Sequence, residues 1–310
     1  DMLARIIVDE GFCVFGSREY MSRVRGGNNS TEIRISDVPV HALLDRIDIL
    51  VALSPNVRQN IRERISGDTV ILGDRELLNG ELEDLGASFV DIPLSKLAKD
   101  AGGKIYSNSI AAGVLLGVLG LGTEGASEFY RGRFAGKDDV IGKNISACAA
   151  GHELGLSISE GEGALSGRRA NAGAGRMILN GSDAVSLGAM AAGCTFVTAY
   201  PMSPATGVLS FFAKNAEKAG AVVEQVEDEI SAINMAVGAS YAGARPMVTT
   251  SGGGFALMGE GLSLAGVMET PVVVHLSQRP GPATGMATRT EQADLDLALF
   301  SGHGEFPRAI

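Results

Sequence analysis

The stretch AVVEQVEDEISAINMAVGASYAGARPMVTTSGGG, residues 221–254, decides the fold class of this chain. Its β-type run at 221–226 and the next one at 246–250 enclose a segment whose apolar residues recur at helical spacing. A strand, a helix and a second strand in this order form a parallel βαβ unit. The sequence therefore predicts an α/β protein with a doubly wound sheet, in which ligands gather at the carboxyl ends of the strands.

The division into two domains follows from the same alternation of β-type runs and helical segments and from the length of the chain. Further β-type runs are predicted in the second half at 176–179, 195–199 and 271–276, and in the first half at 12–15, 31–35, 48–53, 69–72 and 88–92. Residues 108–121 predict an apolar helix, whose all-round hydrophobicity indicates burial or contact with another subunit. The segment 159–175 is rich in glycine and polar residues, and its apolar residues follow neither the helical nor the strand spacing, as is typical of linkers. We expect a domain at 1–158, a linker at 159–175 and a second domain at 176–310.

Composition excludes several classes of protein. The formal net charge of -10 argues against a nucleic-acid groove, which needs clustered Lys and Arg. No run approaches the roughly 20 apolar residues of a membrane span and no leader opens the chain, so we expect a cytoplasmic protein. Cys13, Cys148 and Cys194 are too far apart for a zinc or iron–sulfur motif. The chain opens inside a helical pattern at 1–8 and ends in a strand-like run at 304–310, so we expect residues to be missing at both ends.

The turn after the run 195–199 reads YPMSPAT, residues 200–206. Ser203 suits a helix N-cap and Pro204 suits the first helical turn. One interpretation is a well-capped helix. The other is a rigid loop that directs the Ser203 hydroxyl toward a ligand.

The next turn leads into a helix that opens with three acidic residues, 227–229. Glu229 shares a helical face with Ile233, Ala236 and Val237, so we expect its side chain to point inward. A carboxylate on an apolar face must find a partner or change its protonation equilibrium, which makes it a candidate functional group. An inward acid at a helix start also serves simply to cap backbone amides.

Two more turns are expected at the same edge of the sheet, where the carboxyl ends of the strands lie. TTSGGG, residues 249–254, has a bare backbone that a ligand could approach closely, or that packs tightly between strand and helix. It lacks the Lys of a P-loop and the spacing of GxGxxG. The last turn brings Arg279 directly after a strand and Arg289 further on, and Arg suits bidentate carboxylate recognition. The alternative for both arginines is a solvated position on the surface, and this alternative is favoured more for Arg289 than for Arg279.

These turns together resemble the pyrimidine-binding domain of the 2-oxoacid:ferredoxin oxidoreductases, in alpha subunits where a gamma domain precedes it. The resemblance covers nearly the whole chain, because EYMSRVRGGNNSTEIRIS at 19–36 resembles the gamma domain. The blocks that carry it in the second half are YPMSPAT at 200–206, VEDEISAINMAVGASYAGARPMVTTSGGGFALM at 226–258 and QRPGPATGMATRTEQADL at 278–295. The implied fold is a gamma-type α/β domain followed by a doubly wound, thiamine-diphosphate pyrimidine-binding domain.

The resemblance implies the roles of individual residues. A buried carboxylate against the aminopyrimidine of thiamine diphosphate promotes loss of a proton from the thiazolium carbon. The family usually has Tyr-Pro-Ile-Thr-Pro where this chain has Met202 and Ser203, so a hydroxyl is kept without the methyl that stiffens Thr. The implied residues are Glu229 for catalysis, Ser203 and Arg279 for substrate, and Tyr200, Pro201, Gly253 and Glu229 for the cofactor. Arg23 and Arg25, beside Gly26 and Gly27, are candidates for the phosphates of coenzyme A or for the surface.

The resemblance also implies partners. We expect a separate beta subunit with the diphosphate-binding domain, Mg²⁺ and a 4Fe-4S cluster, because this chain lacks the motifs for all three. The implied reaction is the coenzyme A-dependent oxidative decarboxylation of a 2-oxoacid, with 2-oxoglutarate favoured and ferredoxin as acceptor, in a heterodimer or heterotetramer. A non-redox thiamine-dependent decarboxylase or carboligase is one alternative. A non-catalytic scaffold or nucleotide-binding module is the other.

Overall fold

The computed structural model describes residues 2–19, 29–82, 85–166, 168, 170–283, 285–286 and 291–308. Among the described residues the chain divides into two compact units, the first formed by residues 2–18 and 29–178 and the second by residue 19 and the residues from 179 onward. No helix within these ranges is long and apolar enough to cross a membrane.

The first unit contains two small sheets. One pairs β1 (Cys13–Glu19) with β2 (Ser30–Ser36), and the other has the parallel order β3-β4-β5, formed by Ile49–Ala52, Val70–Gly73 and Ser88–Asp91. The predicted runs at 12–15, 31–35, 48–53, 69–72 and 88–92 are confirmed. The helices are α1 (Met2–Asp9), α2 (Gln59–Arg62), α3 (Arg75–Leu78), α4 (Leu94–Asp100), α5 (Ser107–Leu119), α6 (Glu124–Arg133) and α7 (Asp138–Ile158).

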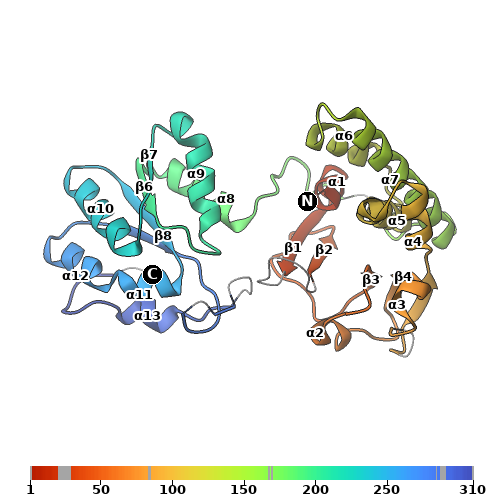
Figure 1. Cartoon of the computed structure of the whole chain (residues 1–310), viewed down its shortest axis with the longest axis horizontal. Helices are drawn as coiled ribbons and strands as arrows, with labels where there is room; N and C mark the ends of the chain where they lie inside the picture. Colours follow the sequence, from red (N-terminus) through yellow and green to blue (C-terminus); the bar gives the residue numbers. More distant parts are fainter. Residues whose placement is uncertain are drawn as a thin grey trace. The chain divides into compact units, whose positions relative to one another are not determined.

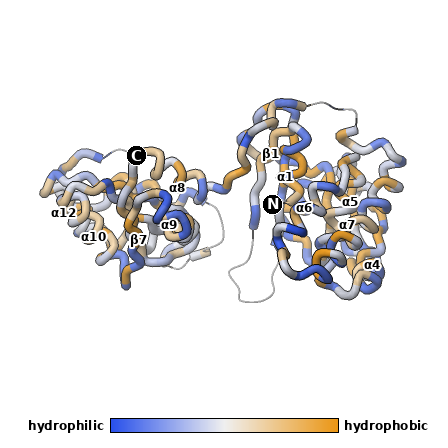
Figure 2. Tube along the Cα trace, turned by 90° about the horizontal axis from the view of Figure 1, so that it is seen from above, coloured by the Kyte–Doolittle hydropathy of each residue, from blue (hydrophilic) through white to orange (hydrophobic). Residues whose placement is uncertain are grey.

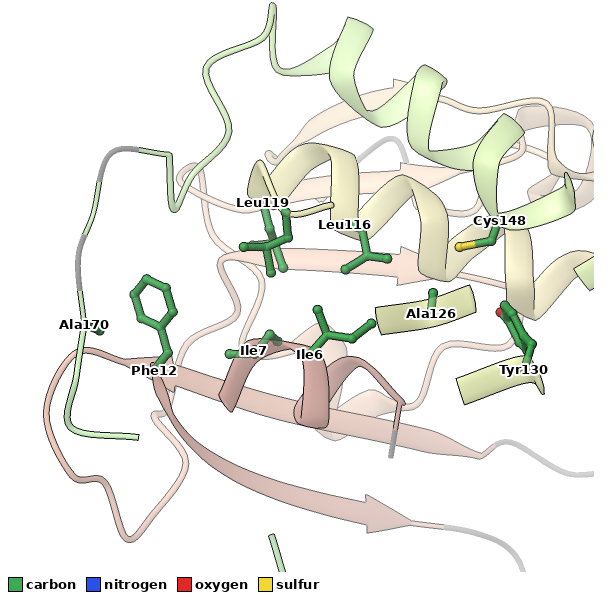
Figure 3. Close-up of a cluster of buried hydrophobic side chains, with 10 residues drawn as sticks. Ile6, Ile7, Phe12, Leu116, Leu119, Ala126, Tyr130, Cys148 and Ala170 are labelled. Atoms are coloured by element: carbon green, nitrogen blue, oxygen red, sulfur yellow. The ribbon is translucent and has the colours of Figure 1, made fainter. Parts of the chain in front are cut away.

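Helix α5 is the expected apolar helix, and it is buried. Glycines let α5 and α7 approach closely: a Cβ at Gly113 or Gly151 would overlap a backbone carbonyl of the other helix. Leu116 and Leu119 of α5 belong to the same cluster of buried side chains as Ile6 and Ile7 of α1 (Figure 3). This cluster forms the core of the first unit on that side of α5.

The second unit is built on one parallel sheet with the order β7-β6-β8-β9. Its strands are Phe196–Ala199 (β6), Val222–Gln225 (β7), Pro246–Thr250 (β8) and Val273–Leu276 (β9). The helices are α8 (Gly181–Ala191), α9 (Thr206–Ala219), α10 (Glu229–Tyr241), α11 (Gly252–Leu257), α12 (Gly259–Val267) and α13 (Leu295–Phe300). The chain runs outward from β6 to β7, returns to β8 and ends at β9, so the doubly wound order is confirmed.

Helices cover both faces of this sheet (Figure 1). On one face Val197 and Met247 pack with Val208 and Phe212 of α9. On the other face Val248 packs with residues of α10, α11 and α12. Helix α9 buries Val208, Leu209 and Phe212, and the colouring of its trace in Figure 2 shows hydrophilic residues along the same helix. With the central strands β6 and β8 covered in this way, the turns after the carboxyl ends of the strands are where the fold predicts a ligand.

Three segments differ from expectation or refine it. The strand predicted at 176–179 is wrong, because these residues form no strand and Met177 is 78% exposed. They lead instead to Asn180, the N-cap of α8. The described residues 301–308 form no strand either. Residues 159–175 contain no helix or strand where they are described, and they pack on the first unit, since the Gly173 N–H donates to the Gly11 carbonyl at 2.9 Å.

Candidate functional site

The turns that follow β6, β7, β8 and β9 bring the described candidate residues of the second unit to one edge of the sheet. Tyr200, Pro201 and Ser203 follow β6, Glu229 follows β7, Gly253 follows β8 and Arg279 follows β9. In a parallel sheet the carboxyl ends of the strands lie at the same edge, and the turns there form the ligand-binding crevice. The fold alone therefore explains why residues so distant in sequence share one region.

Glu229 is the first residue of α10 and its side chain is buried, with 3% of its surface exposed. The predicted inward face is confirmed, because Ile233 and Ala236 on the same side are also fully buried. The Glu229 atom Oε1 has no hydrogen-bond partner among the described residues. A buried polar atom without a partner is costly to the fold, so its presence favours a ligand that completes it.

Asp228 holds the start of this helix. Its carboxylate accepts a hydrogen bond of 2.6 Å from the Ser231 backbone N–H, which makes it the N-cap of α10. The same hydrogen bond lowers the pKa of Asp228 below its ordinary value. Capping is thus done by Asp228, and Glu229 is left free to point into the protein.

The glycine turn that opens α11 packs against two carboxylates. A Cβ at Gly252 would overlap the carboxylate of Asp294. A Cβ at Gly254 would lie 2.5 Å from Glu229 Oε1. Gly253 is more open: its Cβ would lie 3.3 Å from the Ala283 carbonyl oxygen. The close-packing interpretation of this turn therefore holds for Gly252 and Gly254.

Arg279 connects two of the turns. Its side chain is buried, its Nη1 donates to the Ser203 carbonyl at 2.8 Å and its Nη2 donates to the Ala283 carbonyl at 3.3 Å. Its Nε is buried and has no partner among the described residues. The surface interpretation of Arg279 is therefore wrong, and part of the guanidinium is still available to a ligand.

Ser203 differs from its predicted capping role. Helix α9 begins at Thr206 and its N-cap is Ala205, so Ser203 lies in the turn before the helix. The peptide bond between Ser203 and Pro204 is cis, and Ser203 is exposed. The N-cap prediction is wrong because the helix begins at Thr206 and not at Pro204, so Ala205 takes the cap position. The exposed hydroxyl fits the other interpretation, a loop open to a ligand.

Three further residues of this region were not predicted. Ser251 and Thr198 are fully buried, and their hydroxyl oxygens have no hydrogen-bond partner within the described ranges. The third is Asp294, whose Oδ2 atom also has no partner there. Ser251 had a usable signal, since it directly precedes the three glycines. Thr198 looks like an ordinary strand residue and Asp294 like an ordinary residue before a helix, so only the tertiary structure identifies them.

His275 is a polar residue inside the apolar run of β9. One ring nitrogen, Nδ1, lies 2.8 Å from the Thr249 hydroxyl, and partial burial lowers the pKa of His275. Burial therefore disfavours the protonated form of the ring, which shares one hydrogen bond with the neighbouring strand. Among the described residues, no group of three or more His, Cys, Asp or Glu side chains could hold a metal ion. The candidates Arg23, Arg25, Gly26, Gly27 and Arg289 lie outside the described residues.

Comparison with known proteins matches both halves of the chain to one enzyme family. Residues 1–154 match the family described as pyruvate ferredoxin/flavodoxin oxidoreductase, and residues 187–310 match its thiamine diphosphate-binding domain. A 2-oxoacid:ferredoxin oxidoreductase alpha subunit from Aeropyrum pernix is 30% identical over 97% of this chain and 56% of its own length. This chain belongs to the 2-oxoacid:ferredoxin oxidoreductase alpha-subunit family.

Two more members of the family show how far the likeness extends. The 2-oxoglutarate oxidoreductase subunit KorA of Mycobacterium tuberculosis is 32% identical, over 92% of this chain and 48% of the relative. The solved 2-oxoglutarate:ferredoxin oxidoreductase of Magnetococcus marinus, with 2-oxoglutarate, coenzyme A and succinyl-CoA bound, superposes with a TM-score of 0.85 at 30% identity. That match covers 99% of this chain and 54% of the solved chain. The chain thus spans about half the length of the family members it matches, with the expected order of a gamma-like and then a thiamine diphosphate-binding domain.

Proposed function

We propose that this chain supplies the aminopyrimidine-binding part of the active site in a 2-oxoacid:ferredoxin oxidoreductase. The reaction is the coenzyme A-dependent oxidative decarboxylation of a 2-oxoacid to an acyl-CoA and carbon dioxide, with ferredoxin as electron acceptor. The observation that carries the proposal is the buried Glu229 oxygen without a partner at the carboxyl edge of the sheet. The thiamine diphosphate-binding family match over residues 187–310 supports it.

The residues present fit the cofactor. When bound, thiamine diphosphate supplies the carbon nucleophile that adds to the keto group of the substrate. Glu229 would hold a proton between its carboxylate and a ring nitrogen of the aminopyrimidine, which gives Oε1 the partner it lacks. Because Glu229 is buried, with 3% of its surface exposed, the low local dielectric strengthens that hydrogen bond. Tyr200, Pro201 and Gly253 would line the ring, since their turns follow the two central strands.

The substrate carboxylate would bind at Arg279 and Ser203. The Nε of Arg279 and the second N–H of each terminal nitrogen are not used by the hydrogen bonds to the Ser203 and Ala283 carbonyls, so a carboxylate can accept two of them. The Ser203 carbonyl fixes the guanidinium while its exposed hydroxyl adds a donor. We propose 2-oxoglutarate as the substrate, because relatives that share this half of the chain are named for 2-oxoglutarate.

The rest of the site would come from a partner. We propose a beta subunit that carries the diphosphate-binding domain, Mg²⁺ and a 4Fe-4S cluster, in a heterodimer or heterotetramer that passes electrons to ferredoxin. The designation of the relatives as alpha subunits supports a multi-subunit enzyme.

Replacement of Glu229 tests the proposal in the protein assembled with its beta subunit. We expect Glu229→Ala to lower 2-oxoacid oxidation by at least about 10²-fold, because a general acid–base partner contributes that much. Glu217→Ala, on the exposed face of α9, is the matched control and should leave the rate unchanged. Ferredoxin reduction with coenzyme A over a panel of 2-oxoacids measures both. A Glu229→Ala rate within twofold of the parent contradicts the proposal, and a colourless but active assembly favours a non-redox decarboxylase.

A further inference from the structure

Gly254 is a glycine in a position that does not require glycine for its backbone. Helix α11 opens with Gly252, Gly253 and Gly254, and none of the three has a positive φ. Alanine has the higher helix propensity at such positions. The reason for glycine must therefore be space.

The space beside Gly254 is filled by the site carboxylate. A Cβ there would lie 2.5 Å from Glu229 Oε1 and 2.7 Å from Glu229 Cγ, and it would overlap the Thr250 hydroxyl oxygen. Real Cβ atoms essentially never come closer than 3.0 Å to another atom, so something would have to move. The neighbouring Gly253 has no contact of this kind with Glu229.

Glu229 is 3% exposed and lies on the buried face of α10. Ala232 and Ile233, one turn further along α10, are completely buried, and Val248 of the sheet is completely buried in the same cluster. A side chain at position 254 would therefore force the Glu229 carboxylate into another rotamer or push α11 away from α10. Either change moves Oε1.

We infer that Gly254 is a positioning residue that acts through Glu229: the missing side chain at 254 determines where the carboxylate lies. The inference rests on the proposed role of Glu229, which it deepens. A shift of a fraction of an ångström at Oε1 weakens a hydrogen bond to the cofactor ring without removing the carboxylate.

Thermal unfolding of the assembled, cofactor-free protein tests the contact. We expect Gly254→Ala to lower the Tm by roughly 4 °C, from overpacking. In a Glu229→Ala background the same substitution should lower the Tm by clearly less, because the overlap with Glu229 is gone and only the one with the Thr250 hydroxyl remains. An equal drop in both backgrounds overturns the inference. So does a drop that persists with Glu229→Ala and disappears only with Thr250→Ala, because Thr250 would then be the neighbour that matters.

Cofactor binding tests the positioning. We expect Gly254→Ala to weaken the binding of thiamine diphosphate with Mg²⁺ about tenfold by calorimetry, while the KM for the 2-oxoacid stays within about twofold. Gly188→Ala is the matched control, since it also adds a methyl within a helix of this unit but meets open space. Unchanged cofactor affinity in Gly254→Ala overturns the inference. Full activity of Glu229→Ala would instead overturn the proposed function, and the unfolding comparison would still report on the contact itself.

Discussion

Arg279 shows how one buried side chain can serve structure and chemistry together. Its two terminal nitrogens each donate to a backbone carbonyl, one in the turn after β6 and one in the turn after β9. These bonds fix the planar guanidinium, so its remaining donors point in a defined direction. The ammonium of Lys has no such plane and cannot span both carbonyls. The proposed recognition of a substrate carboxylate therefore depends on the shape of Arg as well as on its charge.

We expect Arg279→Lys to lower kcat/KM for the 2-oxoacid at least about tenfold, chiefly by raising KM, because one bidentate interaction is lost. The matched control is Arg245→Lys. Arg245 also donates to a backbone carbonyl, that of Ala192, but lies at the start of β8, away from the carboxyl edge. Steady-state kinetics on the assembled protein measures both. A normal KM for Arg279→Lys would show that the guanidinium is only structural.

Helix α10 positions the carboxylate of Glu229, and the first turn of this helix depends on Asp228. The Ser231 N–H donates to Asp228 at 2.6 Å and lowers its pKa. A carboxyl group whose pKa is lower in the folded protein stabilises the fold above its unfolded pKa of about 3.9 and loses that effect as the pH falls. The start of α10 should therefore weaken in acid.

We expect Asp228→Ala to lower the Tm by roughly 2 °C at pH 7, while Asp228→Asn keeps an acceptor for the Ser231 N–H and loses less. The advantage of the parent protein over Asp228→Asn should shrink as the pH falls below about 4, since the charge that separates them is being titrated. Thermal scans of the three proteins between pH 7 and pH 3.5 measure this. A constant gap across that range would exclude the charge of Asp228 as its cause.

The elements that could be predicted from sequence are those decided by local pattern. The run at 246–250 became β8 without change, because a fully buried apolar strand between Pro246 and a glycine turn has few alternatives. The strand predicted at 176–179 did not form. A segment with β-type residues becomes a strand only beside a neighbouring strand, and no strand pairs with this one. The inward direction of Glu229 followed from helical periodicity. The contacts of Asp294 with Gly252 and of Arg279 with Ser203 join residues far apart in sequence, so local pattern could not predict them.

At the scale of the whole chain, each unit encloses its own core and buries its own cysteines. Cys148 belongs to the cluster beneath α5 and α7 in the first unit (Figure 3), and Cys194 belongs to the cluster between β6 and α9 in the second. Burial raises the pKa of Cys148 to about 11 and also raises that of Cys194. Burial likewise raises the pKa of the nearby Tyr130 to about 12, so this pocket of the first unit holds only neutral groups at pH 7.

We expect none of the three thiols, Cys13, Cys148 and Cys194, to react with a disulfide reagent within minutes in the folded protein at pH 7. All three are buried, and at a pKa of about 11 roughly one Cys148 in ten thousand is a thiolate at that pH. Denaturant should release all three at once. On heating, Cys148 reports the opening of the first unit and Cys194 that of the second, so mass spectrometry of the labelled peptides shows whether the two cores open at one temperature. Fast labelling of Cys148 below the unfolding temperature would contradict its position in a closed core.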